Sequence, residues 1–236
     1  MEISFISPFC NLIEKFTSIS MLNRANQKGI VQYNFFDLFS FSDDPNNRID
    51  DYPYGGGDGM ILKAQPIYNA YKKVIDGCSS KPRVIYPTPD GEILSTAISE
   101  NLSKEDNLIF ICGHYKGIDQ RIRDDIVTDE ISIGDYILTG GELPACIIAD
   151  SIVRLVPGVL NSIESAKTDS FYDGLLDCPH YTRPEEYNGL KVPKVLISGN
   201  HKKIEEWKIN ERVNKTKLKR PDLYKKHIES KNQKVD

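Results

Sequence analysis

The sequence predicts an α/β protein with a parallel sheet, helices on both of its faces, and a small, mostly helical C-terminal domain. Short β-branched apolar runs alternate with stretches of helical spacing over the first two thirds of the chain. The runs are nearly continuous, which is typical of parallel strands buried on both faces. After residue 159 this alternation stops, and polar and helical patterns follow.

Four apolar runs are interpreted as strands of this sheet. They are residues 3–7 (ISFIS), 83–88 (RVIYPT), 107–113 (NLIFICG) and 129–135 (DEISIGD). Helical spacing occupies the intervals between them, at residues 9–27, 66–76, 92–101 and 117–126. A further helix is predicted over residues 141–159, because Pro144 suits its first turn and Pro157 ends it.

The domain boundaries follow from where the α/β pattern lapses. Residues 1–159 form the predicted α/β domain, and the polar, small residues 160–171 are interpreted as a linker. Residues 172–236 form the predicted small domain, with helical stretches near 201–213 and 220–230. Trp207 is expected in the core of that domain, on the apolar stripe of the first stretch.

Composition excludes several classes of protein. The 236 residues are 39% hydrophobic, an ordinary globular value, and no apolar run approaches the roughly 20 residues of a membrane helix. The N-terminus lacks a basic region followed by a long apolar segment, so no secretion signal is predicted and a cytoplasmic location is expected. Five widely spaced cysteines without a C-x-x-C pair are interpreted as buried free thiols, and no metal ligands are predicted.

Charge is distributed unevenly along the chain. Residues 191–236 hold 14 Lys and Arg against 6 Asp and Glu, whereas the first 190 residues hold 16 against 28. A basic tail on an acidic body indicates a polyanionic partner such as RNA. A solvated helical face explains the same charges equally well, so charge alone leaves both interpretations open.

Three glycine- and proline-containing loops follow predicted strands. They are "YPTPDG" (86–91), "CGHYKGID" (112–119) and "IGDYILTGGELP" (133–144). Ligands of parallel α/β sheets bind beyond the carboxyl ends of strands, and glycine lets the backbone approach a ligand closely. The loops therefore predict a pocket for a nucleotide-like small molecule. Neither G-x-G-x-x-G nor the P-loop motif occurs, and "YGGGDGM" (54–60) is a weak phosphate signal that a tight loop also explains.

Seven motifs resemble those of a known family. In order along the chain they are "DDYPYGGGDGM", "CGHYKGIDQRI", "SIGDYILTGGELPA", "VPGVL", "DSF", "GLLDCPHYTRP" and "SGNHKKIEEW". They closely resemble the bacterial tRNA (guanine-N1)-methyltransferases, knotted SPOUT-type enzymes that modify the guanine just 3′ of the anticodon. The resemblance runs from residue 1 to about residue 222.

The resemblance implies a deep C-terminal trefoil knot in the α/β domain, although true knots are nearly absent from proteins in general. It also implies a homodimer in which the tail of one chain closes over the pocket of the other. The implied cofactor is S-adenosylmethionine, bound in the knot. The residues implied to line its site are Tyr86, Pro89, Gly113, Gly117, Ile133, Gly134, Asp135, Tyr136, Ile137, Leu138, Gly140, Gly141 and Pro144.

The resemblance also implies the catalytic residues. Asp169 matches the family's general base, which removes the proton from guanine N1, and Arg154 matches the cation that stabilises charge on O6. Without the resemblance, Asp169 would be interpreted as a solvated linker acid or N-cap and Arg154 as a helix C-terminal cation. Contact with the anticodon stem-loop of tRNA is assigned to Asp50, Asp177, His180 and Arg183.

Three positions depart from the family pattern. Lys116 stands where the family usually has Glu, a carboxylate associated with Mg²⁺, and an ammonium group is not a Mg²⁺ ligand. A metal role is therefore left open, and contact of Lys116 with an RNA phosphate is one hypothesis. Tyr52 replaces a common Arg, and Asp58 replaces a common Pro or Ala.

Two alternative functions compete with methyl transfer. A non-catalytic RNA-binding protein would use the same scaffold, but the intact glycine loop, Asp169 and Arg154 disfavour it. A nicotinamide-dependent oxidoreductase fits the α/β pattern, but the absence of G-x-G-x-x-G disfavours that class. Neither DNA nor a membrane is expected as a partner.

Overall fold

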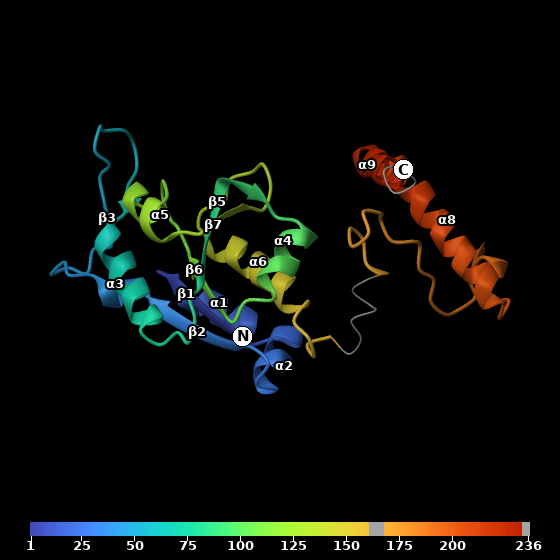
Figure 1. Ribbon diagram of the computed structural model, residues 1–236, viewed down its shortest axis with the longest axis horizontal. Helices are drawn as coiled ribbons and strands as arrows, with labels where there is room; N and C mark the ends of the chain where they lie inside the picture. The colour runs from blue at the N-terminus through green and yellow to red at the C-terminus, as the bar shows by residue number, and fades with distance from the viewer. Residues whose placement is uncertain (161–167, 233–236) are drawn as a thin grey trace. The chain divides into compact units, whose positions relative to one another are not determined.

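The computed structural model describes residues 1–160 and 168–232 (Figure 1). The chain divides into two compact units, Met1–Asn161 and Ser162–Asp236. Most of the linker expected at residues 160–171 lies outside the described residues, so its role stays a prediction.

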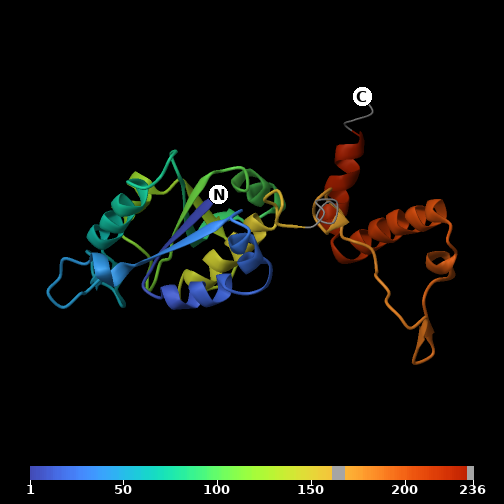
Figure 2. The ribbon, with the colours of Figure 1, turned by 90° about the horizontal axis from the view of Figure 1, so that it is seen from below.

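A five-stranded sheet forms the centre of the first unit (Figures 1 and 2). Its strand order is β2-β1-β6-β5-β7, and every neighbouring pair is parallel. The strands are β1 (Glu2–Ser7), β2 (Gln32–Asp37), β5 (Arg83–Ile93), β6 (Asn107–Ile111) and β7 (Asp129–Ser132). All five residues of the central strand β6 are buried, as the continuous apolar run predicts.

Helices cover both faces of the sheet, as predicted. One apolar cluster contains residues from α1 (Cys10–Thr17), α2 (Ser20–Gln27), α4 (Thr96–Leu102) and α6 (Glu142–Val153). The opposite cluster contains residues from α3 (Ala64–Ile75), α5 (Gln120–Ile126) and the 3-10 helix η1 (Leu38–Phe41). Alternate residues of β6 enter the two clusters, because successive strand side chains point to opposite faces.

Several elements of this unit differ from the sequence prediction. Strand β2 was not predicted, because Gln32, Asn34 and Asp37 interrupt its apolar pattern; it lies at the sheet edge, where polar side chains reach water. The predicted helix 9–27 is two helices, since Ser20 has a left-handed φ of 52° that breaks the helical path.

Strand β5 extends to Ile93, into the region predicted as a helix from residue 92. Its register with β7 shifts between Pro87 and Glu92, so residues 88–91 bulge out of the ladder. Helix α4 begins only at Thr96, where the Ser95 side chain accepts a hydrogen bond from the N–H of Ile98. The bulge places the "TPDG" segment at the carboxyl side of the sheet.

A short antiparallel pair accompanies the sheet. It consists of β3 (Asp50–Asp51) and β4 (Ile61–Leu62). The glycine-rich segment "YGGGDGM" forms the loop between these strands. That loop therefore has both ends held by backbone pairing.

The second unit contains the two predicted helices, both longer than expected: α8 (His201–Lys219) and α9 (Pro221–Asn232). It also contains β8 (Glu186–Tyr187), β9 (Leu190–Lys191) and η2 (Lys194–Ile197). Trp207 is only partly buried, with its ring centroid 6.4 Å from that of Tyr181, so its prediction as a core residue is wrong. Among the described helices, none has the length and apolar character needed to cross a bilayer.

Candidate functional site

A cavity of about 550 Å³ lies at the carboxyl ends of β5, β6 and β7. Three segments wall it: residues 86–90 after the first half of β5, 113–117 after β6, and 131–144 from β7 to the start of α6. We call this cavity the three-loop pocket. Its volume lies within the roughly 300–1,000 Å³ range of small-molecule sites.

Twelve of the thirteen residues that the resemblance assigns to the cofactor line the three-loop pocket. Asp135 is exposed and is not among the lining residues, so its contact with a cofactor stays a prediction. The twelve are Tyr86, Pro89, Gly113, Gly117, Ile133, Gly134, Tyr136, Ile137, Leu138, Gly140, Gly141 and Pro144.

Ten further lining residues were not assigned to the cofactor from the sequence, although Lys116 was noted there as a departure from the family pattern. Most are neighbours of the predicted ones within the same loops and could have been found by extending them. The exception is Arg123 of α5, which only the tertiary fold brings to the pocket. The ten are Pro87, Thr88, Asp90, His114, Tyr115, Lys116, Arg123, Ile131, Ser132 and Thr139.

Two of the loops cross in close contact. The N–H of Gly141 donates to the carbonyl of Gly113 at 2.7 Å, and His114 bridges to Gly140. A Cβ on Gly141 would lie 2.7 Å from the backbone nitrogen of Gly113, and a Cβ on Gly140 would collide with the His114 ring. Glycine at these positions therefore permits a backbone crossing that any side chain would block.

A paired cation closes one wall of the pocket. Arg123 donates to Asp90 at 2.7 Å and to Glu130 at 2.7 and 2.8 Å, and its guanidinium lies 5.3 Å from the Tyr86 ring centroid. Hydrogen bonds from Thr88 and then from Arg123 hold the pKa of Asp90 below its usual value. Burial raises the pKa of Tyr86, so its phenol stays neutral as a hydrogen-bonding group.

A buried carboxylate lies next to the crossing of the segments at Gly113 and Gly141. Glu142 is the first residue of α6 and is 4% exposed. It accepts a hydrogen bond from the Ser7 hydroxyl at 2.8 Å, and its other oxygen lies 3.7 Å from Nε2 of His114. A negative charge is favourable at a helix N-terminus, which offsets part of the cost of burying this group. The end of β1 is thereby tied to two walls of the pocket.

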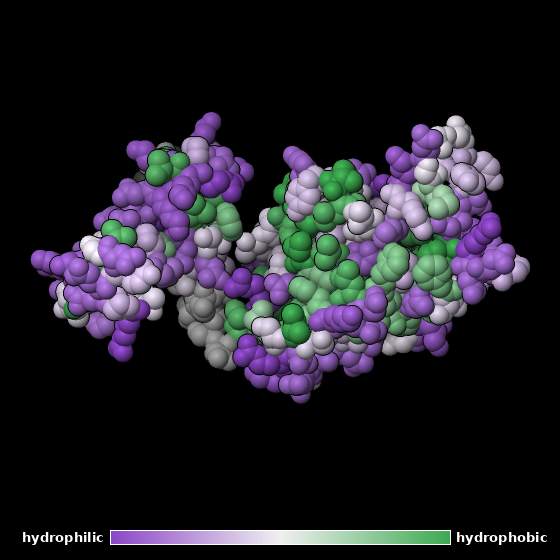
Figure 3. All heavy atoms as spheres, turned by 180° about the vertical axis from the view of Figure 1, so that it is seen from behind, coloured by the Kyte–Doolittle hydropathy of each residue, from purple (hydrophilic) through white to green (hydrophobic). Residues whose placement is uncertain are grey.

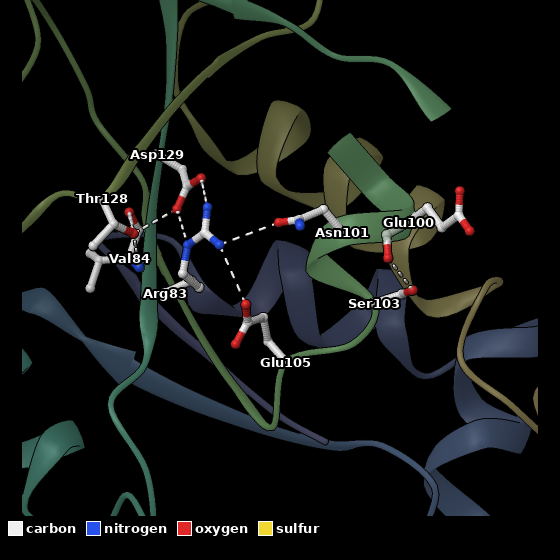
Figure 4. Close-up of polar contacts among 8 residues, drawn as sticks. All are labelled: Arg83, Val84, Glu100, Asn101, Ser103, Glu105, Thr128 and Asp129. Atoms are coloured by element: carbon white, nitrogen blue, oxygen red, sulfur yellow. Dashed lines mark hydrogen bonds and ion pairs between the residues drawn. The ribbon is translucent and has the colours of Figure 1, made fainter. Parts of the chain in front are cut away.

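A second polar cluster lies at the amino ends of β5 and β7 (Figure 4). Arg83 donates to Asp129 through Nε at 2.9 Å, and to Asn101 and Glu105 at 3.3 Å each. Arg83, Asn101 and Asp129 also border a cavity of about 380 Å³. Because its guanidinium is already paired with carboxylates, Arg83 is interpreted as a structural tie between strands.

The predicted RNA-contact residue Asp50 lies beside the pocket. The Tyr115 hydroxyl donates to the Asp50 carboxylate, and burial followed by this hydrogen bond raises the pKa of Tyr115. Tyr115 lines the pocket, and Asp50 belongs to β3. The structure thus joins the hairpin that carries the glycine-rich loop to the pocket rim.

The two predicted catalytic residues lie in different units. Arg154 caps the C-terminus of α6 and is partly buried. Burial raises the pKa of Asp150, and the charge of Arg154 opposes part of this rise. Asp169 lies at the start of the second unit and is partly buried. The pairing of these two residues around one substrate stays a prediction.

The second unit brings Asp177 and His180 together. Nε2 of His180 and Oδ2 of Asp177 are 2.7 Å apart. Burial opposes ionisation of Asp177, but hydrogen bonds from His180 and the N–H of Cys178 outweigh it and lower its pKa. Arg183, three residues further on, is exposed.

The cysteines only partly follow their interpretation as buried free thiols. All five are free, but Cys10 and Cys78 are partly exposed. Cys178 is buried and shares with Asp177 and His180 a group whose potential ligand atoms all lie within 4.8 Å. The sequence argument that no cysteine has partners at ligand spacing is therefore incomplete for Cys178, and an absence of metal stays a prediction.

The fold and the three-loop pocket define an α/β protein with a cavity of small-molecule size, walled by glycine-containing loops beyond the carboxyl ends of parallel strands. Comparison with known proteins gives the particular family. The family model described as tRNA (Guanine-1)-methyltransferase TrmD matches residues 1–226, and the chain belongs to this family.

Curated relatives cover nearly the whole chain. A tRNA (guanine-N(1)-)-methyltransferase of Bacillus subtilis is 52% identical over 96% of this chain and 93% of its own length. One from Clostridioides difficile is 50% identical over 97% of this chain and 100% of its own. One from Lachnospira eligens is 47% identical over 97% of both chains. The resemblance drawn from the motifs is thereby confirmed.

Proposed function

We propose that this protein transfers a methyl group from S-adenosylmethionine to N1 of the guanine 3′-adjacent to the tRNA anticodon. The proposal rests mainly on one observation. The chain is about half identical to proteins named tRNA (guanine-N(1)-)-methyltransferase, and twelve of the residues expected to bind the cofactor line one cavity. A tRNA substrate implies a cytoplasmic location.

The lining of the pocket fits the proposed cofactor. S-adenosylmethionine supplies a methyl group activated by a positively charged sulfur. The backbone of residues 113–117 and 133–141 presents N–H and C=O groups suited to an adenine edge and a ribose. Apolar side chains such as Ile133 and Leu138 exclude water from part of the cavity.

Asp169 and Arg154 are proposed to act on the guanine. N1 carries a proton at neutral pH, so its lone pair becomes nucleophilic only when that proton is removed. The Asp169 carboxylate accepts the proton as the N1–carbon bond forms and the sulfur–methyl bond breaks. The Arg154 guanidinium stabilises the negative charge that develops on O6. Each group contributes on the order of 3–5 kcal/mol if well placed.

RNA recognition is assigned to the second unit together with Asp50. Residues 191–236 carry an excess of eight positive charges, which favours binding of phosphates. Asp177, His180 and Arg183 are polar groups in this unit for contacts with an unstacked base or its neighbours. The target guanine must leave its stack to reach the pocket.

A homodimer and a trefoil knot complete the proposal. The knot is supported by the close crossing at Gly113 and Gly141. The dimer is supported by exposed apolar side chains on two helices that pack together, Phe9 and Leu12 around α1 with Leu143 and Ile147 on α6. Figure 3 shows a broad hydrophobic area on the first unit, which contains α1 and α6. Covering such a surface is a common reason for stable association.

The test is methylation of an unmodified tRNA transcript with labelled S-adenosylmethionine, followed by mapping of the modified base. Label at N1 of the guanine next to the anticodon is the expected result. RNA binding without methyl transfer would favour the non-catalytic alternative. Calorimetric titration with NAD tests the alternative of a nicotinamide-dependent oxidoreductase. Methylation reactions with and without EDTA test whether Mg²⁺ is required.

A further inference from the structure

Lys116 and Arg123 both line the three-loop pocket, but among the residues that the structure describes only Arg123 has partners of opposite charge. Arg123 is engaged by two carboxylates. The Lys116 ammonium, by contrast, makes no hydrogen bond or ion pair with any residue in the described part of the chain, and the residue is exposed. An unpaired ammonium at the rim of a substrate pocket is available to an incoming anion.

The glycine-rich loop holds the Lys116 side chain at the rim. A Cβ on Gly59 would lie 3.2 Å from Cγ and 3.4 Å from Cε of Lys116, so the aliphatic stem runs along the bare backbone of this glycine. The N–H of Lys116 also donates to the carbonyl of Met60 at 3.0 Å. The lysine is therefore anchored at both its backbone and its stem, which restricts where the ammonium can reach.

The same loop offers free backbone donors. Gly57 and Gly59 have φ values of 110° and 98°, a conformation that glycine adopts without strain. The N–H groups of Gly57, Asp58 and Gly59 donate to no acceptor among residues 1–160 and 168–232. Amide donors beside a lysine are a typical combination for binding a phosphate.

We propose that Lys116 and the amides of residues 57–59 bind a backbone phosphate of the RNA substrate at the pocket rim. This inference rests on the proposed function, because it takes tRNA as the polyanion. The site positions the nucleotide next to the cofactor and takes no part in proton transfer. Two acids of the adjoining segments already have other partners, since Asp119 is paired with Arg121 at 2.7 Å and Asp50 accepts a hydrogen bond from Tyr115.

The carboxylate of Asp58 is the group that opposes this site. It is exposed in the same loop, and its charge repels a phosphate bound by the neighbouring amides. The opposite arrangement, in which Asp58 pairs with Lys116 as a latch, requires the two residues to support each other. If Lys116 binds phosphate, removing its charge weakens RNA binding and removing the Asp58 charge strengthens it. If the two residues instead pair with each other, both substitutions weaken RNA binding.

The experiment compares full-length Lys116→Gln, Lys116→Arg and Asp58→Asn with the wild type. An unmodified tRNA transcript is the RNA probe, and S-adenosylmethionine is titrated separately by calorimetry. Lys116→Gln is expected to weaken tRNA binding roughly tenfold at low salt and to reduce the slope of log K against log salt by about 0.7. Lys116→Arg retains binding and Asp58→Asn strengthens it, and Lys116→Gln lowers the affinity for S-adenosylmethionine by a smaller factor than the affinity for tRNA.

Lys81→Gln is the matched control, because Lys81 is exposed and precedes β5 at the end of the sheet away from the pocket. Equal tRNA binding by the Lys116 and Lys81 variants overturns the inference. Weaker tRNA binding by both Lys116→Gln and Asp58→Asn overturns the inference in favour of an Asp58–Lys116 pair. Weaker binding of S-adenosylmethionine alone overturns it in favour of a contact between Lys116 and the cofactor. If wild-type protein neither binds nor methylates tRNA, the proposed function itself fails.

Discussion

The two units of the chain bury their side chains to very different extents. In the first unit, apolar residues from four of the five strands of the sheet, all but the edge strand β2, and from helices on both faces are almost inaccessible. In the second, the buried apolar residues among those described are Leu175 and Cys178. Ile209 and Leu218 of α8 remain 49% and 81% exposed.

This difference separates a scaffold from a recognition surface. A pocket whose backbones cross at 2.7 Å needs a rigid core around it, and the sheet provides one. A unit with little core of its own keeps charged and aromatic side chains free for contact with a large partner. We therefore expect substitutions in the two units to affect different measurements.

The largest expected effect concerns a residue of the second unit. Asp169→Asn removes the proposed base, so turnover is expected to fall about 10²–10⁴-fold while the Kd for S-adenosylmethionine is unchanged. Single-turnover methylation and calorimetry provide the two measurements. Glu185→Gln, an exposed acid of the same unit, is the control and should retain activity. Normal turnover in Asp169→Asn would place the base elsewhere.

A pair of core substitutions tests whether the units are independent. Phe110→Ala empties a fully buried site in β6 and should destabilise the first unit by about 3–5 kcal/mol. Thr216→Val should destabilise the second by about 1–2 kcal/mol, because the N–H of Leu176 loses the Thr216 hydroxyl that accepts from it at 2.8 Å. Calorimetry should record the two losses in separate unfolding transitions. A shift of both transitions by either variant would contradict the comparison.

The loop crossing is tested with two glycines of the first unit. Gly141→Ala places a methyl group 2.7 Å from the Gly113 nitrogen and should cost about 1–3 kcal/mol of stability and weaken S-adenosylmethionine binding. Gly77→Ala is the matched control, since its Cβ would meet only the Val74 carbonyl at 3.5 Å. Thermal unfolding and calorimetric titration compare the two. Identical behaviour would mean that the crossing tolerates a side chain.

The smallest expected effect is a pH dependence in the second unit. The pKa of Asp177 is lowered in the folded protein, so its contribution to stability is present above the unfolded value near 3.9 and is lost as pH falls through the lower folded value. Asp177→Asn should therefore be less stable than wild type by about 0.5–1 kcal/mol at pH 6, and the difference should shrink as the pH falls below about 4. Thermal unfolding between pH 3 and 7 measures it, and a difference independent of pH would exclude this cause.

The sequence predicted the first unit better than the second. Four of the five strands and the helix before Pro157 were found, because a buried parallel strand needs a continuous apolar run that is visible locally. The edge strand β2 and the extension of β5 were missed, since pairing with a distant partner overrides their mixed pattern. Trp207 was misplaced because a helical stripe does not reveal whether a neighbour exists to cover it.

By itself the sequence determined the alternation of elements, the three loops and, through its motifs, the family, since each depends on residues adjacent in the chain. Tertiary structure alone decided that Arg123 reaches this cavity and is paired there, and that the Lys116 ammonium lies unpaired among the described residues, with its stem against Gly59. The physical reason is that contacts between segments far apart in sequence depend on how the sheet and its helices pack, and local patterns do not encode those distances.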